Sequence, residues 1–433
     1  MNELQIIYRR PSQLVAHQRN ARKHSDKQID QLMASIRSFG FNVPVLVDDA
    51  GVILAGHGRV AAALKLGLDH VPTVLITHLS DTQRRGFMLA DNRLAELSSW
   101  DDGTLALELE ELSLAEFEIT DTGFELPRID VLIEERHKPS APIDEAEQQP
   151  DPGRVEQVAR LGDLWVLGRH RLFVGDALDP RSFQALLDGE RAQMVFIDPP
   201  FNVPIAGHVS GLGKVRHREF VMASGEMSEA EFGGFLDEAI ARLIEASCDG
   251  SIHYICMDWR GLHTLLSAGR RYTEHKNLCC WVKAQGGMGS LYRSQHELVA
   301  VFKSGKAAHI NNVALGKHGR SRSNVWSMPG MNSFQKGRAE KLAMHPTVKP
   351  VALVADAILD CSKRGGLILD SFAGSGSSII AAERTGRRAA AMELDPKYAN
   401  VILRRFCDVT GIEPINAATG QVVAKRPKAG DRP

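Results

Sequence analysis

Apolar residues along the chain recur with the periods of a mixed α/β protein. In the first third, apolar residues return every three to four positions after Ser25, which begins a capping-box spacing, and predict a helix that Gly40 ends. Residues 60–66 predict a second helix before Gly67. Short apolar runs predict strands, and longer periodic segments predict further helices: strands at 6–8, 44–47, 52–55 and 71–76, and helices at 81–94, 101–112 and 128–136. We therefore expect a small α/β domain with a helical extension over residues 1–136.

A second alternation of apolar strands and amphipathic helices begins beyond residue 154. Strands are expected at 194–197, 250–257, 277–283, 297–303, 367–369 and 388–392, and helices at 180–187, 229–245, 351–363 and 397–409. This order predicts an α/β fold with a Rossmann-like sheet and helices on both faces. Ligands of such sheets bind outside the carboxyl ends of the strands.

Composition divides the chain between these two regions. Residues 137–153 hold four prolines among acidic residues and predict an extended linker. The larger domain is expected over 154–416, and the basic, proline-containing residues 417–433 predict a disordered tail.

Overall composition limits the function classes. The 433 residues are 43% hydrophobic and 24% charged, as in ordinary globular proteins, and the net charge is −1. Affinity for nucleic acid must therefore come from local basic patches. The chain shows no membrane-length apolar run and no signal peptide, and its six cysteines form no Cys-x-x-Cys pair. We expect a cytoplasmic protein with reduced thiols, no metal and no membrane partner.

The apolar run 194–197 stops at Asp198-Pro199-Pro200-Phe201. This places a carboxylate, a rigid turn and an aromatic ring at the end of a strand. Asp198 and a carbonyl of the Pro-Pro turn could accept both hydrogens of an exocyclic base amine and free its lone pair. Phe201 could stack on a base taken out of the helix. The alternative is a surface acid beside a proline turn, and the four residues alone do not decide between the two.

A glycine turn far downstream favours the chemical interpretation. A strand ending at Asp370 is followed by Phe372-Ala373-Gly374-Ser375-Gly376, and the next strand ends at Glu393. Glu393 lies 19 positions after Gly374, near the ~20 expected for an acid that binds a ribose hydroxyl. Ile379 replaces the third glycine of the dinucleotide fingerprint, which favours a nucleoside cofactor without a pyrophosphate.

Together, the two motifs resemble the β class of amino-methylating DNA methyltransferases, over roughly residues 155–412. The resemblance implies S-adenosyl-L-methionine as cofactor and DNA as partner. It implies that Asp198, Pro199, Pro200 and Phe201 hold the target amine, that the glycine turn lies against the methionine part, and that Glu393 holds the ribose. It also implies cofactor contacts by Asp176, Thr347, Lys349 and Asp370. An N-cap for residues 180–187 is an equally open role for Asp176.

Three further segments are candidates for DNA binding. Residues 202–220 predict a mobile loop over the DNA, with plain disorder as the alternative, and residues 286–294 resemble the family's segment beside the target base. The basic residues 305–341 are the candidate target-recognition region, with an ordinary basic loop as the alternative. The candidate contacts are Lys214, Arg216, Arg218, Tyr292, Arg293, Arg320, Arg322, Lys336 and Arg338.

The N-terminal domain contains a turn, Gly56-His57-Gly58-Arg59, that could bind a phosphate. The alternative is a glycine-rich turn with a solvated arginine. Over residues 4–115 the chain resembles the ParB/sulfiredoxin superfamily, which implies a nucleotide turn at Gly56, Gly58 and Arg59. Gly58 stands where ParB proteins usually have an arginine, so nucleotide hydrolysis does not follow from the resemblance.

The resulting prediction is a site-specific DNA methyltransferase with adenine N6 as the preferred target. Asp rather than Ser before Pro-Pro favours adenine, but cytosine N4 remains open. The sequence is also compatible with a mainly DNA-binding, partition-like protein, or with a methylase of RNA or protein. Relatives of this class occur in restriction-modification systems and often form homodimers, so a homodimer is also expected.

Overall fold

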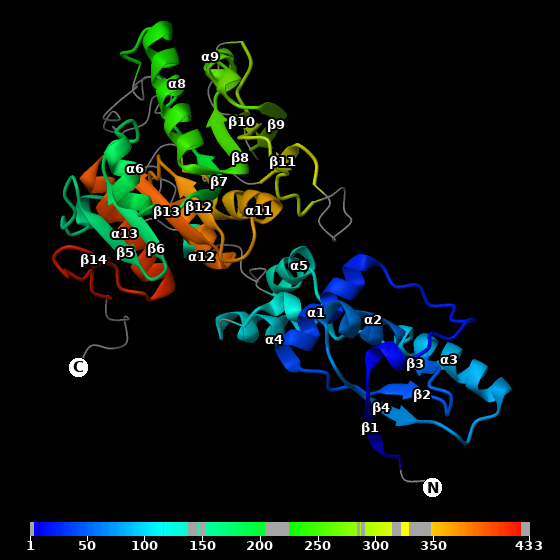
Figure 1. The fold of residues 1–433 in the computed structure, drawn as a ribbon. Coiled ribbons are helices and arrows are strands. Elements are labelled where there is room, and N and C mark those ends of the chain that lie inside the picture. The colour runs from blue at the N-terminus through cyan, green and yellow to red at the C-terminus, as the bar shows by residue number, and fades with distance from the viewer. Residues whose placement is uncertain are drawn as a thin grey trace. The chain divides into compact units, whose positions relative to one another are not determined.

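The computed structural model describes residues 4–115, 117–136, 145–147, 150, 152–203, 225–283, 286, 291–313, 322–328 and 348–425. The chain forms two compact units, Met1–His137 and Lys138–Pro433 (Figure 1). Each unit has its own hydrophobic core. Among the described residues, no helix is long and apolar enough to cross a membrane.

The N-terminal unit is built on a four-stranded sheet in the order β1-β4-β2-β3. β2 runs parallel to β4 and antiparallel to β3, and β1 is antiparallel to β4. Its core is formed by apolar residues of β2, β3, α2 and β4. The elements are β1 Ile6–Arg9, α1 Asp26–Phe39, β2 Val45–Val47, β3 Ile53–Ala55, α2 His57–Leu66 and β4 Val71–Leu75.

Helices complete this unit. The Ser25 hydroxyl accepts the N–H of Gln28 at the start of α1, as the capping-box spacing predicts, and Gly40 ends the helix. Three more helices follow: α3 Asp81–Glu96, α4 Asp102–Leu114 and α5 Leu126–Arg136. Ala106, Leu109 and Ile129 help to form a separate core between α4 and α5.

The C-terminal unit is a ten-stranded sheet in the order β11-β9-β10-β8-β7-β12-β13-β6-β5-β14. Its five central strands, β8 to β6 in that order, are parallel, while β10, β9, β5 and β14 add antiparallel edges. The strands are β5 Leu164–Leu167, β6 His170–Val174, β7 Ala192–Ile197, β8 Ser247–Met257, β9 Glu274–Val282, β10 His296–Lys303, β11 Val325–Ser327, β12 Leu367–Asp370, β13 Arg388–Glu393 and β14 Ile415–Asn416.

Helices cover both faces of this sheet, so the predicted Rossmann-like class is confirmed. Residues of α11, α12 and α13 form one core, and residues of α6, α8 and α9 form the other. Within β7, Met194 and Phe196 enter the first core, whereas Val195 and Ile197 enter the second. A strand buried on both sides needs apolar residues at every position, which explains its continuous apolar run. The helices are α6 Pro180–Leu187, α8 Glu229–Glu245, α9 Leu262–Ala268, α11 Val351–Cys361, α12 Ser377–Arg384 and α13 Pro396–Thr410.

Two boundaries differ from the sequence-based prediction. Ala146, inside the predicted linker, is fully buried in the core of the C-terminal unit. The carboxylate of Glu147 accepts the N–H of Val351 at 2.8 Å and so caps α11. Past the predicted domain end, residues 417–425 are ordered: Val422 pairs with Ile415, and Val423 packs in the core. Composition marked both segments as polar but could not reveal these few anchoring contacts.

Candidate active site

Four carboxylates follow four neighbouring parallel strands. Asp176 follows β6, Glu393 ends β13, Asp370 ends β12 and Asp198 follows β7. All four line one pocket. The chain continues from β7 to β8 in one direction along the sheet and from β12 to β13 in the other, so the crevice at this switch point is the expected ligand site.

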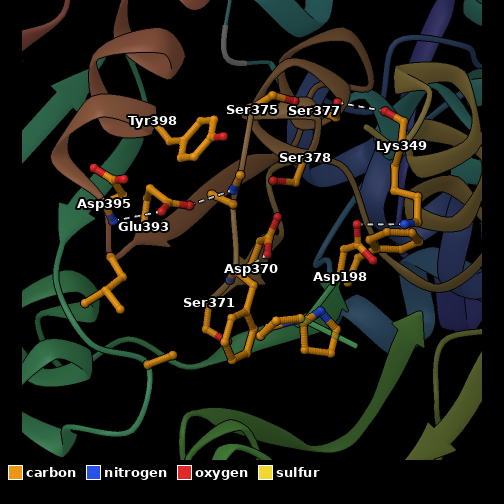
Figure 2. A pocket seen from close by; sticks show the side chains of 18 of the residues that line it. Asp198, Lys349, Asp370, Ser371, Ser375, Ser377, Ser378, Glu393, Asp395 and Tyr398 are labelled. Atoms are coloured by element: carbon orange, nitrogen blue, oxygen red, sulfur yellow. Dashed lines mark hydrogen bonds and ion pairs between the residues drawn. The ribbon is translucent and has the colours of Figure 1, made fainter. Parts of the chain in front are cut away.

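The pocket has two distinct ends (Figure 2). Glu393, Asp395 and Tyr398 lie at one end, and Asp198 and Lys349 lie at the other. Asp370 is placed between them. Phe201 also lines the pocket, and the Lys349 ammonium lies 5.4 Å from the centre of its ring. An elongated ligand could therefore reach from Glu393 to the Asp198 carboxylate.

The glycine turn shapes the wall between these ends. The Gly374 N–H donates to Oε2 of Glu393 at 2.9 Å, and Oε1 of Glu393 accepts the N–H of Asp395 at 2.9 Å. Gly376 has a φ of 82°, and a Cβ there would lie 2.9 Å from Cγ2 of Ile402. Only glycine therefore allows α12 to start so close to α13. The Gly374-Glu393 hydrogen bond fixes the acid predicted to bind a ribose.

Burial makes three carboxyl groups of the pocket weaker acids than usual. It raises the pKa of Asp370 to about 7 and that of Glu393 to about 7, although backbone N–H groups oppose the shift at both. It also raises the pKa of Asp198 to about 6, against the attraction of the Lys349 ammonium. A bound cation would favour the ionised form of each group. The pocket therefore suits a positively charged ligand.

Asp198 presents its two oxygens differently. Oδ2 lies 2.6 Å from the Lys349 ammonium, while Oδ1 is buried and has no hydrogen-bond partner among the described residues. A buried carboxylate oxygen without a donor is costly unless a ligand provides one. Oδ1 is therefore a ready acceptor for an N–H group in the pocket.

Sequence reasoning missed the residues behind Asp198. Lys349 also lies 2.5 Å from Oε1 of Glu297, whose Oε2 binds the Lys283 ammonium at 2.7 Å. Lys349 also lines the pocket together with the glycine turn, so its predicted cofactor contact stays a prediction beside these two ion pairs. A usable signal was the charge of Glu297 directly before the apolar run 298–302 of β10, because a buried carboxylate needs a cationic partner.

Two family comparisons identify this arrangement. The model of the family described as DNA methylase matches residues 192–404. The DNA adenine methyltransferase YhdJ of Escherichia coli (strain K12) is 34% identical over 248 residues, which cover 51% of this chain and 78% of YhdJ. The chain belongs to the DNA methylase family. It is a DNA methyltransferase of the class that acts on adenine N6 or cytosine N4, and the methyl donor of this class is S-adenosyl-L-methionine.

The N-terminal unit of this DNA methylase also has known relatives. Residues 2–93 match the ParB N-terminal domain, and residues 103–161 match the ParB-methyltransferase HTH domain. The ParB-like nuclease domain-containing protein YnaK of Escherichia coli (strain K12) is 46% identical over 83 residues, 19% of this chain and 95% of YnaK. The ParB-like resemblance is therefore confirmed. The helix-turn-helix family was not predicted, because the sequence indicated only separate helices at 101–112 and 128–136 and no motif that joins them.

A second methyltransferase relative spans more of the chain. The Type II methyltransferase M2.MboI of Moraxella bovis is 24% identical over 255 residues, which cover 56% of this chain and 89% of M2.MboI. M2.MboI is thus a relative of the restriction-modification type, as the sequence predicted.

The residues present fit S-adenosyl-L-methionine. The cofactor carries a sulfonium and an ammonium group, and the pocket surrounds its space with acids whose pKa is raised by burial. The Ser371 hydroxyl lines the same pocket and is a buried atom without a described hydrogen-bond partner. Cofactor contacts by Asp370, Phe372, Ala373, Gly374 and Glu393 remain predictions that their place in the pocket lining supports. Gly376 does not line the pocket, so its predicted cofactor contact has only the sequence motif behind it.

Asp176 is available to the same ligand. Asp179, not Asp176, caps α6, because its carboxylate accepts the N–H of Arg181 at 2.9 Å. Asp176 uses Oδ1 to accept the N–H of Leu178 at 2.9 Å and lines the pocket. The alternative role that the sequence left open for Asp176 is thus filled by its neighbour. Thr347 lies outside the described residues.

Asn202 is another residue that the sequence did not single out. Its side chain donates to the carbonyl of Met227 at 2.7 Å and accepts the N–H of Gly225 at 3.0 Å. Its φ of 54° lies in the left-handed region, which asparagine tolerates better than most residues. Asn202 therefore joins the chain after Phe201 to the start of the segment before α8.

Of the predicted DNA contacts, three lie in the described part of the chain. Tyr292 is 84% exposed and Arg293 is also exposed, so both can meet a large partner. Arg322 instead forms ion pairs with Asp356 and Asp360 on α11, which connect its segment to that helix. The remaining candidates, Lys214, Arg216, Arg218, Arg320, Lys336 and Arg338, lie outside the described residues.

The described part of the predicted recognition region is largely structural. Trp326 lies in β11 with only 6% of its surface exposed, and its ring packs in the main core. Asn312 donates to the carbonyls of Leu359 and Ser362 at 2.7 and 2.8 Å. Trp326 and Asn312 therefore have structural contacts of their own. Residues 314–321 and 329–341 lie outside the described part of the chain, and target recognition by 305–341 stays a prediction.

The predicted nucleotide turn begins α2. Gly56 has a φ of 102°, and Arg59 donates to the carbonyl of Pro44 at 3.2 Å. A Cβ at Gly58 would lie 3.1 Å from the ring of His24. Close packing therefore explains Gly58 without a ligand, while a phosphate role for Gly56 and Arg59 stays a prediction.

Proposed function

We propose that this DNA methylase transfers a methyl group to the N6 amine of a flipped adenine in DNA. The observation that carries the proposal is the unpartnered Oδ1 of Asp198 beside the pocket. Asp rather than Ser before Pro-Pro favours adenine, and YhdJ, a relative of this chain, is named as an adenine methyltransferase.

Asp198 and the following turn activate the amine. The lone pair of an exocyclic base nitrogen is delocalised into the ring, so the amine is a weak nucleophile. Oδ1 of Asp198 accepts one N–H and the carbonyl of Pro199 accepts the other, which draws the nitrogen toward a tetrahedral shape. Pro200 keeps the turn rigid, and Phe201 stacks on the base.

S-adenosyl-L-methionine supplies the electrophilic methyl group when bound. The chain contributes mainly by holding the amine in line with that group, and such positioning can lower a barrier by ~7–11 kcal/mol. Transfer would form the N–C bond and break the bond between the methyl group and sulfur, with a neutral thioether as the leaving group. The nitrogen would then lose a proton, which Asp198 Oδ1, a buried oxygen without a described hydrogen-bond partner, could accept.

The experiment is expression in a host that lacks DNA methylation, followed by single-molecule sequencing of its genome. Methyladenine confined to one short sequence motif is the expected result. Methylation at cytosine N4 would keep the mechanism and correct the target base. A genome without any modified base would contradict the proposal.

A further inference from the structure

A chain of alternating charges extends away from the catalytic carboxylate. Asp198 binds Lys349, Lys349 binds Glu297, and Glu297 binds Lys283, with N–O distances of 2.6, 2.5 and 2.7 Å. The side chains of Lys349 and Glu297 are only 5% and 8% exposed. The outer end, Lys283, is one-third exposed.

Such a buried pair is an unusual way to stabilise a fold. Moving charges out of water costs several kcal/mol per ion, and apolar residues of similar volume often serve stability as well. Lys349 is nevertheless buried in the pocket wall, and the buried Glu297 contacts its ammonium group from behind. A role in the chemistry of Asp198 explains why charge is kept there.

The backbone of Lys349 is also fixed to the cofactor wall. The Ser377 hydroxyl donates to the Lys349 carbonyl at 2.8 Å (Figure 2). The Arg405 guanidinium donates to the same hydroxyl at 3.2 Å. With its backbone held, the direction of the Lys349 side chain depends on the acids at its tip. Those acids are Asp198 and Glu297.

We propose that Glu297 is a positioning residue for methyl transfer. It holds the Lys349 ammonium against Oδ2 of Asp198 and thereby keeps Oδ1 free for the target amine. This inference rests on the proposed function. Without the Glu297 charge, Lys349 has only Asp198 as its carboxylate partner and can move across both oxygens.

The surrounding charges agree with this role. The ionisation of Asp198 is influenced by the charges of Lys349, Glu297 and Lys283. Two further titratable groups among the described residues interact with Asp198, namely Asp370 and the Cys256 thiol. Burial opposes ionisation of Glu297, but the Lys349 and Lys283 ammonium groups more than offset it and hold its pKa below the usual range. Glu297 is therefore charged near neutral pH and raises the pKa of Asp198 by repulsion.

The test compares Glu297→Gln with the wild-type enzyme. The amide keeps the shape but not the charge. We expect kcat to fall by at least about tenfold, within the ~10²-fold that a misplacement of ~1 Å can cost. The dissociation constant of S-adenosyl-L-methionine should change less than about twofold, since the positioning acts on the amine. The acid limb of the kcat profile should move to lower pH, because removal of a nearby negative charge lowers the pKa of Asp198.

Two further variants keep the test decisive. Glu297→Asp restores the charge and should return the acid limb toward its wild-type pH. Glu274→Gln removes an exposed acid of β9 that pairs with Lys276, and should leave kcat and its pH profile unchanged. A Glu297→Gln enzyme with wild-type kcat and an unshifted limb would overturn the inference. The inference would also be overturned if kcat fell only because less of the variant is folded, while the acid limb of the kcat profile stayed at its wild-type pH. Thermal unfolding and the stoichiometry of cofactor binding measure the folded fraction. Inactivity of the wild-type enzyme would refute the proposed function instead.

Discussion

Asp198 combines burial with a close positive charge. Burial favours the protonated acid, and the Lys349 ammonium favours the carboxylate, with a resulting pKa of about 6. Only the carboxylate can accept a hydrogen bond from the amine at Oδ1 while it pairs with Lys349. At neutral pH most molecules are therefore in the active form.

The rate of methyl transfer should consequently rise with pH through about 6. Below this value Asp198 is protonated and the active fraction falls about tenfold per pH unit. Single-turnover rates of methyl transfer, measured with saturating cofactor between pH 5 and 8, give this pH dependence. A rate that stays constant from pH 5 to 8 would show that ionisation of Asp198 does not control the step.

Cofactor affinity should rise with pH through about 7. Asp370 and Glu393 have pKa values of about 7 and are partly protonated in the free enzyme at that pH. A cationic ligand favours their ionised forms, so binding releases protons and becomes tighter as the pH rises, until both groups are ionised. Calorimetry in buffers of different ionisation enthalpy measures the proton release, and Asp370→Asn should reduce it. Proton uptake on binding would contradict the assignment.

Individual residues differed in how well their sequence context revealed them. Asp198 and Glu393 stand directly at strand ends, where the fold class already predicts a ligand site. Glu297 lies in β10 and Lys283 directly follows β9, and the antiparallel pairing of these two strands brings them to the site. Their pairing across space has no counterpart in sequence spacing, so sequence reasoning could not assign them.

At the scale of elements, local signals were most informative where they were complete. α6 begins at Pro180 after its N-cap Asp179. α8 begins at Glu229 after its N-cap Ser228, which forms a capping box with Glu231, and both helices have the predicted bounds. By contrast, α11 receives its cap from Glu147, which is distant in sequence. A cap supplied by another segment cannot be read from a helix's own residues.

Glu147→Ala should therefore destabilise the C-terminal unit by ~1 kcal/mol, the usual effect of losing a helix cap. The N–H of Val351 loses its acceptor, and the segment that carries Lys349 loses an anchor. Glu147→Gln is the matched control, because its amide oxygen can still accept the bond. Denaturant unfolding of both variants gives the comparison; equal stability of the alanine variant and the wild type would contradict the role of this cap.

At the scale of the whole molecule, the two units have separate cores, so each should fold by itself. A fragment of residues 138–433 should bind S-adenosyl-L-methionine with an affinity close to that of the full chain. A fragment of residues 154–433 lacks Ala146 and Glu147 and should unfold at a lower temperature. Thermal unfolding with and without cofactor compares the two fragments. Equal stability would instead support the boundary that composition predicted.

We propose that Asp198 orients the target amine in this DNA methyltransferase. The most direct measurement is transfer of a labelled methyl group to DNA by Asp198→Ala, with cofactor binding measured on the same preparation. We expect methyl transfer to be lost while the cofactor dissociation constant stays within a few-fold of the wild-type value. Methyl transfer at the wild-type rate would contradict the account, and loss of transfer together with cofactor binding would indicate a structural role for Asp198.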